Sequence, residues 1–388
     1  MKGAGEVEAW LATARCDDAG ALLEGFVAKL AGAGVPLSRA SCALMTMHPE
    51  LVWRTVQWEA GEGIRLRDQP RSRLDDPFYT ASPVARVRRT KQAVRVPLAL
   101  GDLPFPICQD LRARGATDYL ALPLPFTNGE VTYASFATST PGGFQDEPLA
   151  LLQALAGPLA RRLELESAYF ATQALLEVYL GKNAARRVLA GEVQRGRGEP
   201  IDAAIWFCDL RGFTALGERT RPAELVAILD AYFDAVGSAI ADFGGEVLKF
   251  IGDAVLAIFP VGEDPRDACR RAVSAADRAF ASLARLNDER AARGEEPISI
   301  GVALHRGQVL YGNIGARDRL DFTVISSAVN AASRLESLCK ELGAPLVLSA
   351  ELVRAAEIDD VVDRGEHAVK GLAAPIRVFT KRGARDAE

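Results

Sequence analysis

The sequence predicts two folded units of mixed type, an α/β unit followed by an α+β unit. The length of 388 residues corresponds to two or three domains. The composition, with 49% hydrophobic and 25% charged residues, is that of ordinary globular proteins. A stretch rich in glycine, arginine and glutamate at 191–200 separates two regions of helical and strand patterns. Because this stretch cannot bury a core, we interpret it as a connector.

Residues 1–165 are expected to form the first unit. Apolar residues at helical spacing predict a helix over 19–32. Two β-rich runs, 119–126 and 131–138, flank an Asn-Gly pair. This pair predicts a hairpin, because both central positions of a type I′ turn need positive φ. A helix is expected from about 147 to 167.

The apolar pattern of that last helix can extend as far as Leu180. Its apolar stripe, which includes Leu175, Leu176 and Val178, is either ordinary core or a seam between the helices of two chains. Residues 166–200 are therefore assigned to a linking helix and a connector.

The second unit is expected over 201–382 and opens with an apolar strand over 201–208. The elements expected next are a helix over 221–243, strands over 246–251 and 254–259, a helix over 265–290 and a strand over 298–305. This β-α-β-β-α-β order is typical of a ferredoxin-like α+β fold. The expected additions are strands over 308–312 and 321–325, a helix over 327–342, and strands over 346–348 and 376–381.

Composition and charge argue against several classes of protein. The net charge of −5 is unlike that of proteins whose main task is to bind nucleic acid. No run approaches the roughly 20 apolar residues that span a bilayer, and the first residues lead into no signal-peptide core. The six cysteines are scattered and the three histidines are far apart, so neither a disulfide framework nor a zinc site is expected. We expect a cytoplasmic protein.

Two aspartates of the second unit are candidate metal ligands. Asp209 ends the first strand and precedes the loop 210–214 and a helix, whereas Asp253 lies in a tight turn between two apolar strands. If these strands are neighbours, both carboxylates meet at one edge of the sheet. Two carboxylates beside a phosphate-binding loop suit Mg²⁺. The alternative is that Asp209 caps a helix and Asp253 only makes a turn.

The helix expected over 327–342 carries a second polar pair. Asn330 and Arg334 are four residues apart and share one face, and the other face is apolar. An amide beside a planar guanidinium can hold phosphate oxygens. An ordinary solvated polar face is the alternative.

Four segments of the second unit resemble the catalytic domain of class III nucleotidyl cyclases. In chain order the segments are 206–214, 247–259, 305–315 and 323–336. The resemblance covers about 200–382. It implies that Asp209, Asp253 and the carbonyl of Leu210 hold two Mg²⁺ or Mn²⁺ ions.

The same resemblance implies roles for further residues. Backbone N–H groups near Phe213 and Thr214 would hold the triphosphate of the substrate, and Lys370 would be an additional phosphate-binding residue. Asn330 would orient the ribose, and Arg334 would stabilise the charge that develops on the phosphate. Because family sites form between two catalytic domains and this chain carries both half-sites, a head-to-tail homodimer is expected.

Lys249 and Thr323 match the positions at which the family reads the purine edge. An ammonium and a hydroxyl can serve the N1 acceptor and the N6 amino donor of adenine, whereas guanine presents the opposite pattern. ATP is therefore the expected substrate. Attack of its ribose 3′-oxygen on the α-phosphorus would give 3′,5′-cyclic AMP and pyrophosphate. Ser326 stands where the family usually has glycine, and a positive φ there would strain serine and shift Thr323.

The first unit resembles a GAF-type sensory domain in the order of its elements and in the stretches 115–119 and 141–144. Such domains bind a small ligand or only dimerise, so a regulatory role and an unidentified ligand are implied. Three alternatives to an adenylate cyclase remain: a guanylate cyclase, a catalytically silent nucleotide-binding regulator, and a diguanylate cyclase. The last would carry a Gly-Gly-(Asp/Glu)-Glu-Phe turn, whereas 251–254 read Ile-Gly-Asp-Ala.

Overall fold

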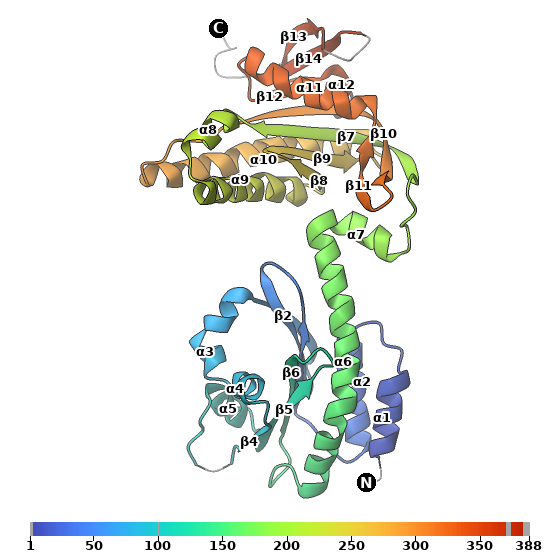
Figure 1. The fold of residues 1–388 in the computed structure, drawn as a ribbon, viewed down its shortest axis with the longest axis vertical. Helices are drawn as coiled ribbons and strands as arrows, with labels where there is room; N and C mark the ends of the chain where they lie inside the picture. Colours follow the sequence, from blue (N-terminus) through green and yellow to red (C-terminus); the bar gives the residue numbers. More distant parts are fainter. Residues whose placement is uncertain (1–2, 100, 370–373, 383–388) are drawn as a thin grey trace. The chain divides into compact units, whose positions relative to one another are not determined.

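The computed structural model describes residues 3–99, 101–369 and 374–382. The chain divides into two compact units, Met1–Val178 and Tyr179–Glu388, and each is described by itself (Figure 1). The division falls inside the segment predicted to link the units. Among the helices described, none combines the length and the apolar character needed to cross a lipid bilayer.

The first unit is built on an antiparallel sheet with the strand order β3-β2-β1-β6-β5-β4. The strands are β1 (Arg39–Met45), β2 (Leu51–Glu59), β3 (Gly63–Pro70), β4 (Val94–Pro97), β5 (Asp118–Pro125) and β6 (Val131–Thr138). The hairpin predicted from the Asn-Gly pair is confirmed, because β5 pairs with β6 along its whole length. The type I′ turn is wrong, however: Gly129 has a φ of +87°, but Asn128 does not have the positive φ that such a turn requires. Instead, the N–H of Gly129 donates to the carbonyl of Phe126 at 3.1 Å within a longer loop.

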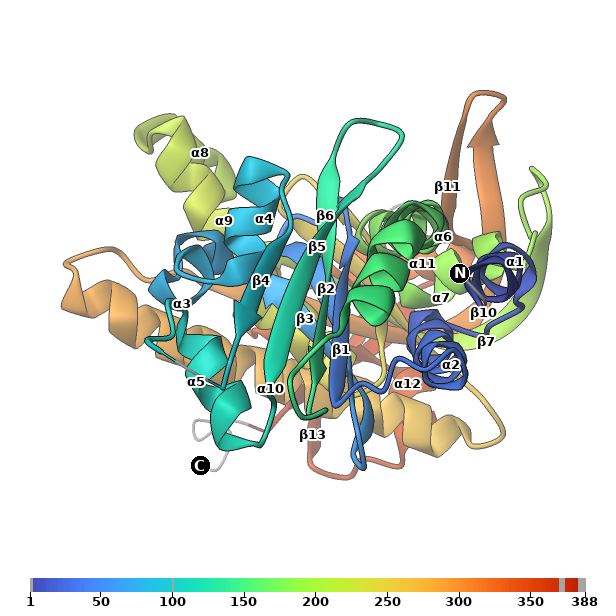
Figure 2. The same cartoon turned by 90° about the horizontal axis from the view of Figure 1, so that it is seen from below.

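Helices cover both faces of this sheet (Figure 2). On one face, α1 (Ala4–Thr13), α2 (Ala19–Gly32) and α6 (Asp146–Leu180) pack over an apolar core. The other face is covered by α3 (Pro77–Thr80), α4 (Pro83–Thr90) and α5 (Pro106–Ala113), with the short 3-10 helix η1 (Arg71–Asp75) beside α3. The helix predicted over 19–32 is confirmed as α2. The predicted extension of the exit helix is confirmed too, since α6 runs unbroken to Leu180.

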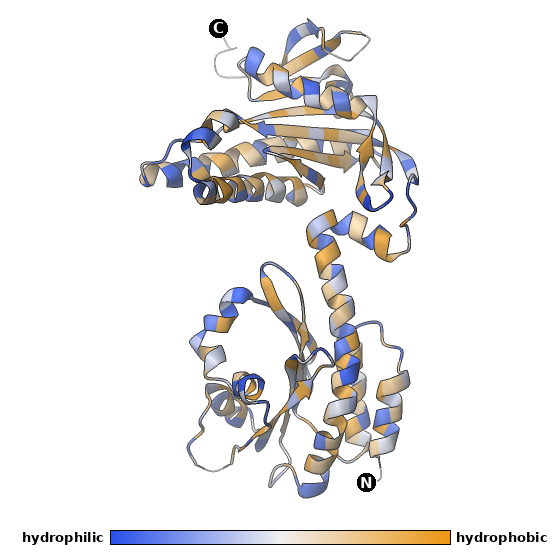
Figure 3. Cartoon of the chain, in the orientation of Figure 1, coloured by the Kyte–Doolittle hydropathy of each residue, from blue (hydrophilic) through white to orange (hydrophobic). Residues whose placement is uncertain are grey.

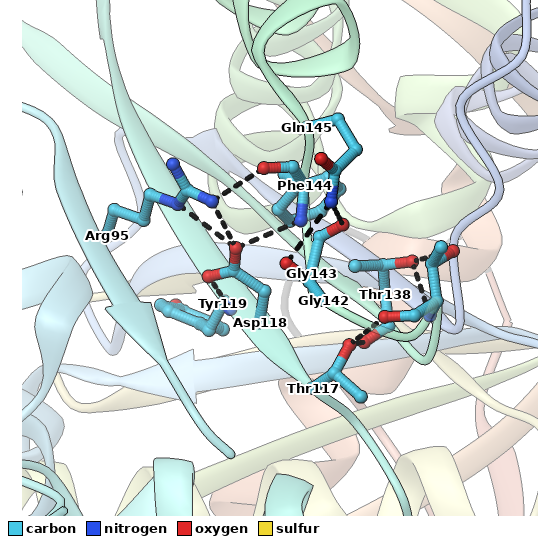
Figure 4. A network of polar contacts seen from close by, with 10 residues as sticks. Arg95, Thr117, Asp118, Tyr119, Thr138, Gly142, Gly143, Phe144 and Gln145 are labelled. Atoms are coloured by element: carbon cyan, nitrogen blue, oxygen red, sulfur yellow. Dashed lines mark hydrogen bonds and ion pairs between the residues drawn. The ribbon is translucent and has the colours of Figure 1, made fainter. Parts of the chain in front are cut away.

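The two stretches that carry the GAF-type resemblance, 115–119 and 141–144, lie side by side (Figure 4). Arg95 on β4 donates to Oδ2 of the buried Asp118 from Nε at 3.0 Å and from Nη2 at 2.7 Å. The same oxygen accepts a backbone N–H of the second stretch at 3.0 Å. Gly143 has a φ of +75°, and a Cβ there would lie 2.6 Å from this oxygen. Glycine therefore permits the close approach of the two stretches.

The second unit has a sheet with the order β13-β14-β12-β10-β7-β9-β8, and β11 pairs with β10 outside this row. The strands are β7 (Gly198–Leu210), β8 (Glu246–Ile251), β9 (Ala254–Pro260), β10 (Ile300–Ala316), β11 (Arg319–Ile325), β12 (Leu346–Ser349), β13 (Val361–His367) and β14 (Ile376–Lys381). The sequence-predicted core is confirmed: β10, β7, β9 and β8 are antiparallel neighbours, joined in ferredoxin-like order. These central strands are mostly hydrophobic (Figure 3).

The helices of this unit also form two layers. One layer packs on the main core around Trp206 and Phe259, and it consists of α8 (Phe213–Arg219), α9 (Pro222–Asp242), α10 (Pro265–Ala292) and α12 (Ala350–Ala356). The other layer consists of α7 (Lys182–Leu189) and α11 (Ser327–Glu341). The helix boundaries predicted for α9, α10 and α11 are correct to within two residues.

One predicted boundary is wrong. The strands expected over 298–305 and 308–312 are a single strand, β10, which pairs with β7 without a break down to Gly312 opposite Gly198. Gly307, which suggested the break, lies against α11, where a Cβ would meet the Ala328 side chain at 2.5 Å. This glycine serves close packing of strand and helix rather than a turn.

Candidate active site

Asp209 and Asp253 come together where the inner strands β7 and β9 of the second sheet meet the loops at one end. Asp209 is the last but one residue of β7, and Asp253 follows Gly252 (φ +65°) in the turn between β8 and β9. Because β9 pairs with β7 as far as Cys208 opposite Val255, the turn lies beside the end of β7. The pKa of Asp253 is raised to about 7 by its partial burial, by its hydrogen bond with Asp209 and by the repulsion between the two carboxylates. The alternative that Asp209 caps a helix is wrong, because Gly212 is the N-cap of α8.

The paired carboxylates fit a divalent cation. Their closeness raises a pKa, and a bound cation would relieve the repulsion between them. The backbone N–H of Leu210 donates to Oδ1 of Asp209 at 2.9 Å and so orients this carboxylate. Over the residues described there is no group of three or more His, Cys, Asp or Glu side chains that could hold a metal. A cation bound here would keep coordination positions for water or phosphate oxygens, as Mg²⁺ prefers.

Tyr232 on α9 and Cys208 on β7 form the buried floor beneath this pair. The Tyr232 hydroxyl and the Cys208 sulfur lie 3.3 Å apart. Burial raises the pKa of the Cys208 thiol to about 11, so the thiol is neutral near pH 7. Because the thiolate is the nucleophilic form of cysteine, Cys208 is not a candidate nucleophile.

Arg211, in the loop after Asp209, makes an ion pair that the sequence did not reveal. Its Nη1 lies 3.0 Å from Oε1 of the buried Glu336 on α11. A Cβ on Gly301 would lie only 1.8 Å from the Arg211 guanidinium, so this group sits directly on the backbone of β10. Both charged residues belong to segments that resemble the cyclase family, and this was the only signal available.

The structure places Lys249 and Thr323 on adjoining strands, β8 and β11. Nζ of Lys249 lies 2.8 Å from Oδ2 of Asp321, and this hydrogen bond holds the pKa of the Asp321 carboxyl below its usual range. Asp321 and Thr323 are two residues apart on β11 and share one face. The Thr323 hydroxyl is buried and has no hydrogen-bond partner among the described residues. The sequence analysis did not single out Asp321. Its position two residues before Thr323 in a predicted strand indicated only that both side chains lie on the same face.

Asn330 and Arg334 project from the exposed face of α11, and the predicted apolar face of this helix is buried. Within the parts of the chain described, no hydrogen bond or ion pair joins either residue to Asp209 or Asp253. The strain that a positive φ would cause at Ser326 is absent, because its φ of −175° is ordinary extended backbone. Its hydroxyl caps α11 by accepting the N–H groups of residues 328 and 329.

The predicted phosphate-binding residues are placed only in part. Phe213 and Thr214 open α8, and no side chain caps this end of the helix. Their N–H groups therefore lie in the first turn of the helix that follows the Asp209 loop. Lys370 lies outside the described residues.

Comparison with known proteins places the second unit in a family. Residues 199–381 match the family model described as the adenylate and guanylate cyclase catalytic domain. Over 166 residues the chain is 40% identical to an adenylate cyclase of Anabaena cylindrica. The matched segment covers 42% of this chain and 32% of that protein. Over 165 residues it is 33% identical to adenylate cyclase 1 of Rhizobium meliloti (strain 1021). That match covers 42% of this chain and 24% of the relative.

Among solved structures, the adenylyl cyclase CyaB from P. aeruginosa matches at 28% identity and a TM-score of 0.44, covering 50% of this chain and 100% of that one. The matched segment spans only a quarter to a third of the length of the two curated relatives. The family match lies wholly in the second unit, so the GAF-type resemblance of the first unit stays a prediction. Residues 199–381 belong to the class III adenylate and guanylate cyclase catalytic-domain family.

Proposed function

We propose that this chain is an adenylate cyclase that converts ATP to 3′,5′-cyclic AMP and pyrophosphate. The observation that carries the proposal is the pair Asp209 and Asp253 at one sheet edge of a cyclase-family domain. The Anabaena relative named adenylate cyclase supports the choice of reaction. In this reaction the substrate's own 3′-oxygen is the nucleophile, so the protein need not supply one. The neutral state of the buried Cys208 thiol agrees with this.

Asp209, Asp253 and the carbonyl of Leu210 are the residues that would hold the two Mg²⁺ or Mn²⁺ ions. When bound, these ions would neutralise the triphosphate and favour ionisation of the attacking hydroxyl. The protein's remaining contribution is positioning and charge stabilisation. Phe213 and Thr214 offer backbone N–H donors to the triphosphate at the start of α8.

Lys249 and Thr323 account for the choice of base. The ammonium donates to adenine N1, and the Thr323 hydroxyl, unpaired among the described residues, accepts from the N6 amino group. Lys249 has three N–H groups, so it can bind the base while one of them stays on Asp321. Asp321 thereby orients the ammonium.

Asn330 and Arg334 complete the site from a second copy of the chain, in a head-to-tail homodimer with two sites. Asn330 orients the ribose, and the Arg334 guanidinium stabilises charge on the α-phosphate. Exposed apolar side chains beside both half-sites support such an interface: Phe250 and Ile251 next to the aspartates, and Leu310 and Ile325 on the strands of Thr323.

Mixing two inactive variants tests the dimer and the site together. Asp209→Ala and Arg334→Ala are each expected to be inactive, because each removes one half of both sites. After subunit exchange the heterodimer holds one intact site, so an equal mixture should recover about a quarter of the parent activity. The measurement is cyclic AMP formed from ATP with Mn²⁺, separated by chromatography.

The matched control mixes Asp209→Ala with Asp253→Ala, which damage the same half-site and should not complement. Recovery in both mixtures, or in neither despite demonstrated subunit exchange, would contradict the shared site. Nucleotide binding by the parent without any cyclic product would instead favour the silent regulator.

Lys249→Glu tests the base preference. The parent should favour ATP over GTP, and the variant should lose at least about tenfold of that preference, because a carboxylate accepts from guanine N1–H and cannot donate to adenine N1. The measurement is the ratio of kcat/KM for the two nucleotides. Lys340→Glu makes the same charge change on the exposed end of α11 and should leave the ratio unchanged. Equal rates of the parent on both nucleotides would point to the guanylate or mixed-specificity alternative.

A further inference from the structure

A cavity of about 460 Å³ lies in the first unit, far in sequence from the catalytic residues. Residues of the sheet and of the helices α3, α4 and α5 line it. Its volume is within the range of sites that bind small molecules. Nothing in the cyclase reaction uses it, because every residue that lines it belongs to the first unit.

The floor of this cavity is polar, although it is the centre of a sheet covered by helices. Arg39 and Ser41 on β1 and Ser135 on β6 are buried there, and Ser41 is in register with both Gln57 and Ser135. Arg39 Nη2 donates to Gln57 Oε1 at 2.9 Å, and the two serine hydroxyl oxygens are 2.9 Å apart. Burying polar groups costs free energy that apolar packing would not. A polar floor within an apolar rim is the usual make-up of a ligand site.

Aromatic rings form the walls above this floor. Trp53 and Tyr79 lie with their ring centroids 4.9 Å apart, and Tyr133 lines the cavity from β6. Phe78 also lines it, yet its side chain is 71% exposed. An exposed phenylalanine at a cavity mouth offers apolar surface that a ligand ring can cover.

The cavity lining carries three arginines and one carboxylate. Arg73 is paired with Asp76, and Arg39 lies 3.7 Å from Glu59. Arg67 on β3 also lines the cavity, and its side chain makes no ion pair or hydrogen bond with the residues described. Asp110 is the one carboxylate in the lining. An arginine that is unpaired in the protein can bind a carboxylate or phosphate group of a ligand.

We infer that this cavity binds a small organic anion, a molecule with one ring and one carboxylate, phosphate or similar group. The anionic group lies against Arg67, and the ring lies between Trp53 and Phe78. The hydroxyl and amide groups of the floor supply the hydrogen bonds that orient it. The inference goes beyond the proposed cyclase activity and does not depend on it.

Binding of a fluorescent aromatic sulfonate to the full-length protein tests the inference. The probe is 8-anilinonaphthalene-1-sulfonate, and its uncharged counterpart is N-phenyl-1-naphthylamine. Arg67→Ala should weaken saturable binding of the sulfonate about tenfold and leave binding of the uncharged probe unchanged. Gln69→Trp, which places a bulky side chain in the same cavity wall, should abolish saturable binding of both.

Arg65→Ala is the matched control, since it removes the same charge from β3 at a residue that does not line the cavity and that pairs with Glu62. It should bind both probes as the parent does. The inference is overturned if the parent shows no saturable binding of the sulfonate. It is equally overturned if Arg67→Ala and Arg65→Ala behave alike, or if binding survives in Gln69→Trp. None of these measurements involves ATP, so a failure here leaves the cyclase proposal standing, and the reverse holds as well.

Discussion

Asp209 and Asp253 place two like charges side by side, and this arrangement costs stability when no cation is bound. Burial and the neighbouring carboxylate raise the pKa of Asp253 to about 7 in the folded protein, against an ordinary value near 3.8. The folded state therefore holds a proton that the unfolded chain has already lost between about pH 4 and pH 7. Stability contributed by this group is present at low pH and is lost as the pH rises through this window.

Asp253→Asn should therefore stabilise the metal-free protein at pH 8 and have little effect at pH 4.5. Because the carboxyl is partly solvated, the gain at pH 8 is expected to be about 1 kcal/mol, or roughly 2 to 4 °C in Tm. Thermal unfolding with a chelator present measures it. Asp288→Asn, an exposed aspartate of α10, is the control and should show no such pH dependence. The same gain for Asp253→Asn at both pH values would contradict the raised pKa.

Single residues also mark the limit of prediction from sequence at this site. The two aspartates and the polar face of α11 were predictable because each follows from a local pattern. The contact of Asp321 with Lys249 was not predictable, because it spans 72 residues and joins two strands, β8 and β11, that are not paired with each other. The sequence also left the conformation at Ser326 open: its backbone is extended, so a serine is not strained there, and its hydroxyl caps the next helix.

At the scale of elements, the ion pair between Arg211 and Glu336 joins β7 to α11. Asp209, a proposed metal ligand, lies at the end of β7 just before Arg211, and α11 carries Asn330 and Arg334. In the proposed homodimer these two half-sites of one subunit belong to different active sites. This partly buried pair fixes their spacing, because neither element can shift without separating the charges.

A double-mutant cycle measures this link. Arg211→Ala and Glu336→Ala should each destabilise the second unit by about 2 to 3 kcal/mol, because each leaves a desolvated partner, and the double variant should cost clearly less than the sum. Denaturant unfolding of the four proteins gives the coupling. The exposed pair Arg219 and Glu296 is the control, with an expected coupling below about 1 kcal/mol. Additive effects at Arg211 and Glu336 would exclude the link.

Elements were predictable where the local pattern and the tertiary environment agree. α10 begins with an Asp264 cap and a proline and shows a clear apolar stripe, so its start was predicted correctly. β3 was missed because it is an edge strand with four consecutive exposed residues and no alternation. β10 was divided in the prediction because Gly307 signals a turn in sequence but fits against α11 in space.

At the scale of the whole molecule, α6 is the element that continues from the first unit to the start of the second. The sequence left open whether its apolar stripe is core or a seam between two chains. Leu165, Tyr169 and Tyr179 are 61%, 62% and 79% exposed, so they are not core of the single chain. Together with Thr172 and Leu176 they form a row that shares only Leu176 with the residues named for the predicted stripe. This row repeats at alternating steps of four and three residues, which is typical of a two-helix seam.

If two copies of α6 pair along this stripe, the phase of the helix sets how the catalytic units of the dimer meet. Inserting two alanines after Thr172 turns the following residues by about 200° and breaks the stripe, whereas duplicating the seven residues 166–172 turns them by only about 20° and preserves it. We therefore expect the two-residue insertion to change the specific cyclase activity several-fold and the seven-residue insertion to retain it. Activity with Mn²⁺ and ATP at matched dimer content decides the question. Equal activities in the two insertion variants would mean that α6 only tethers the units, and that regulation by the first unit does not pass through its helical phase.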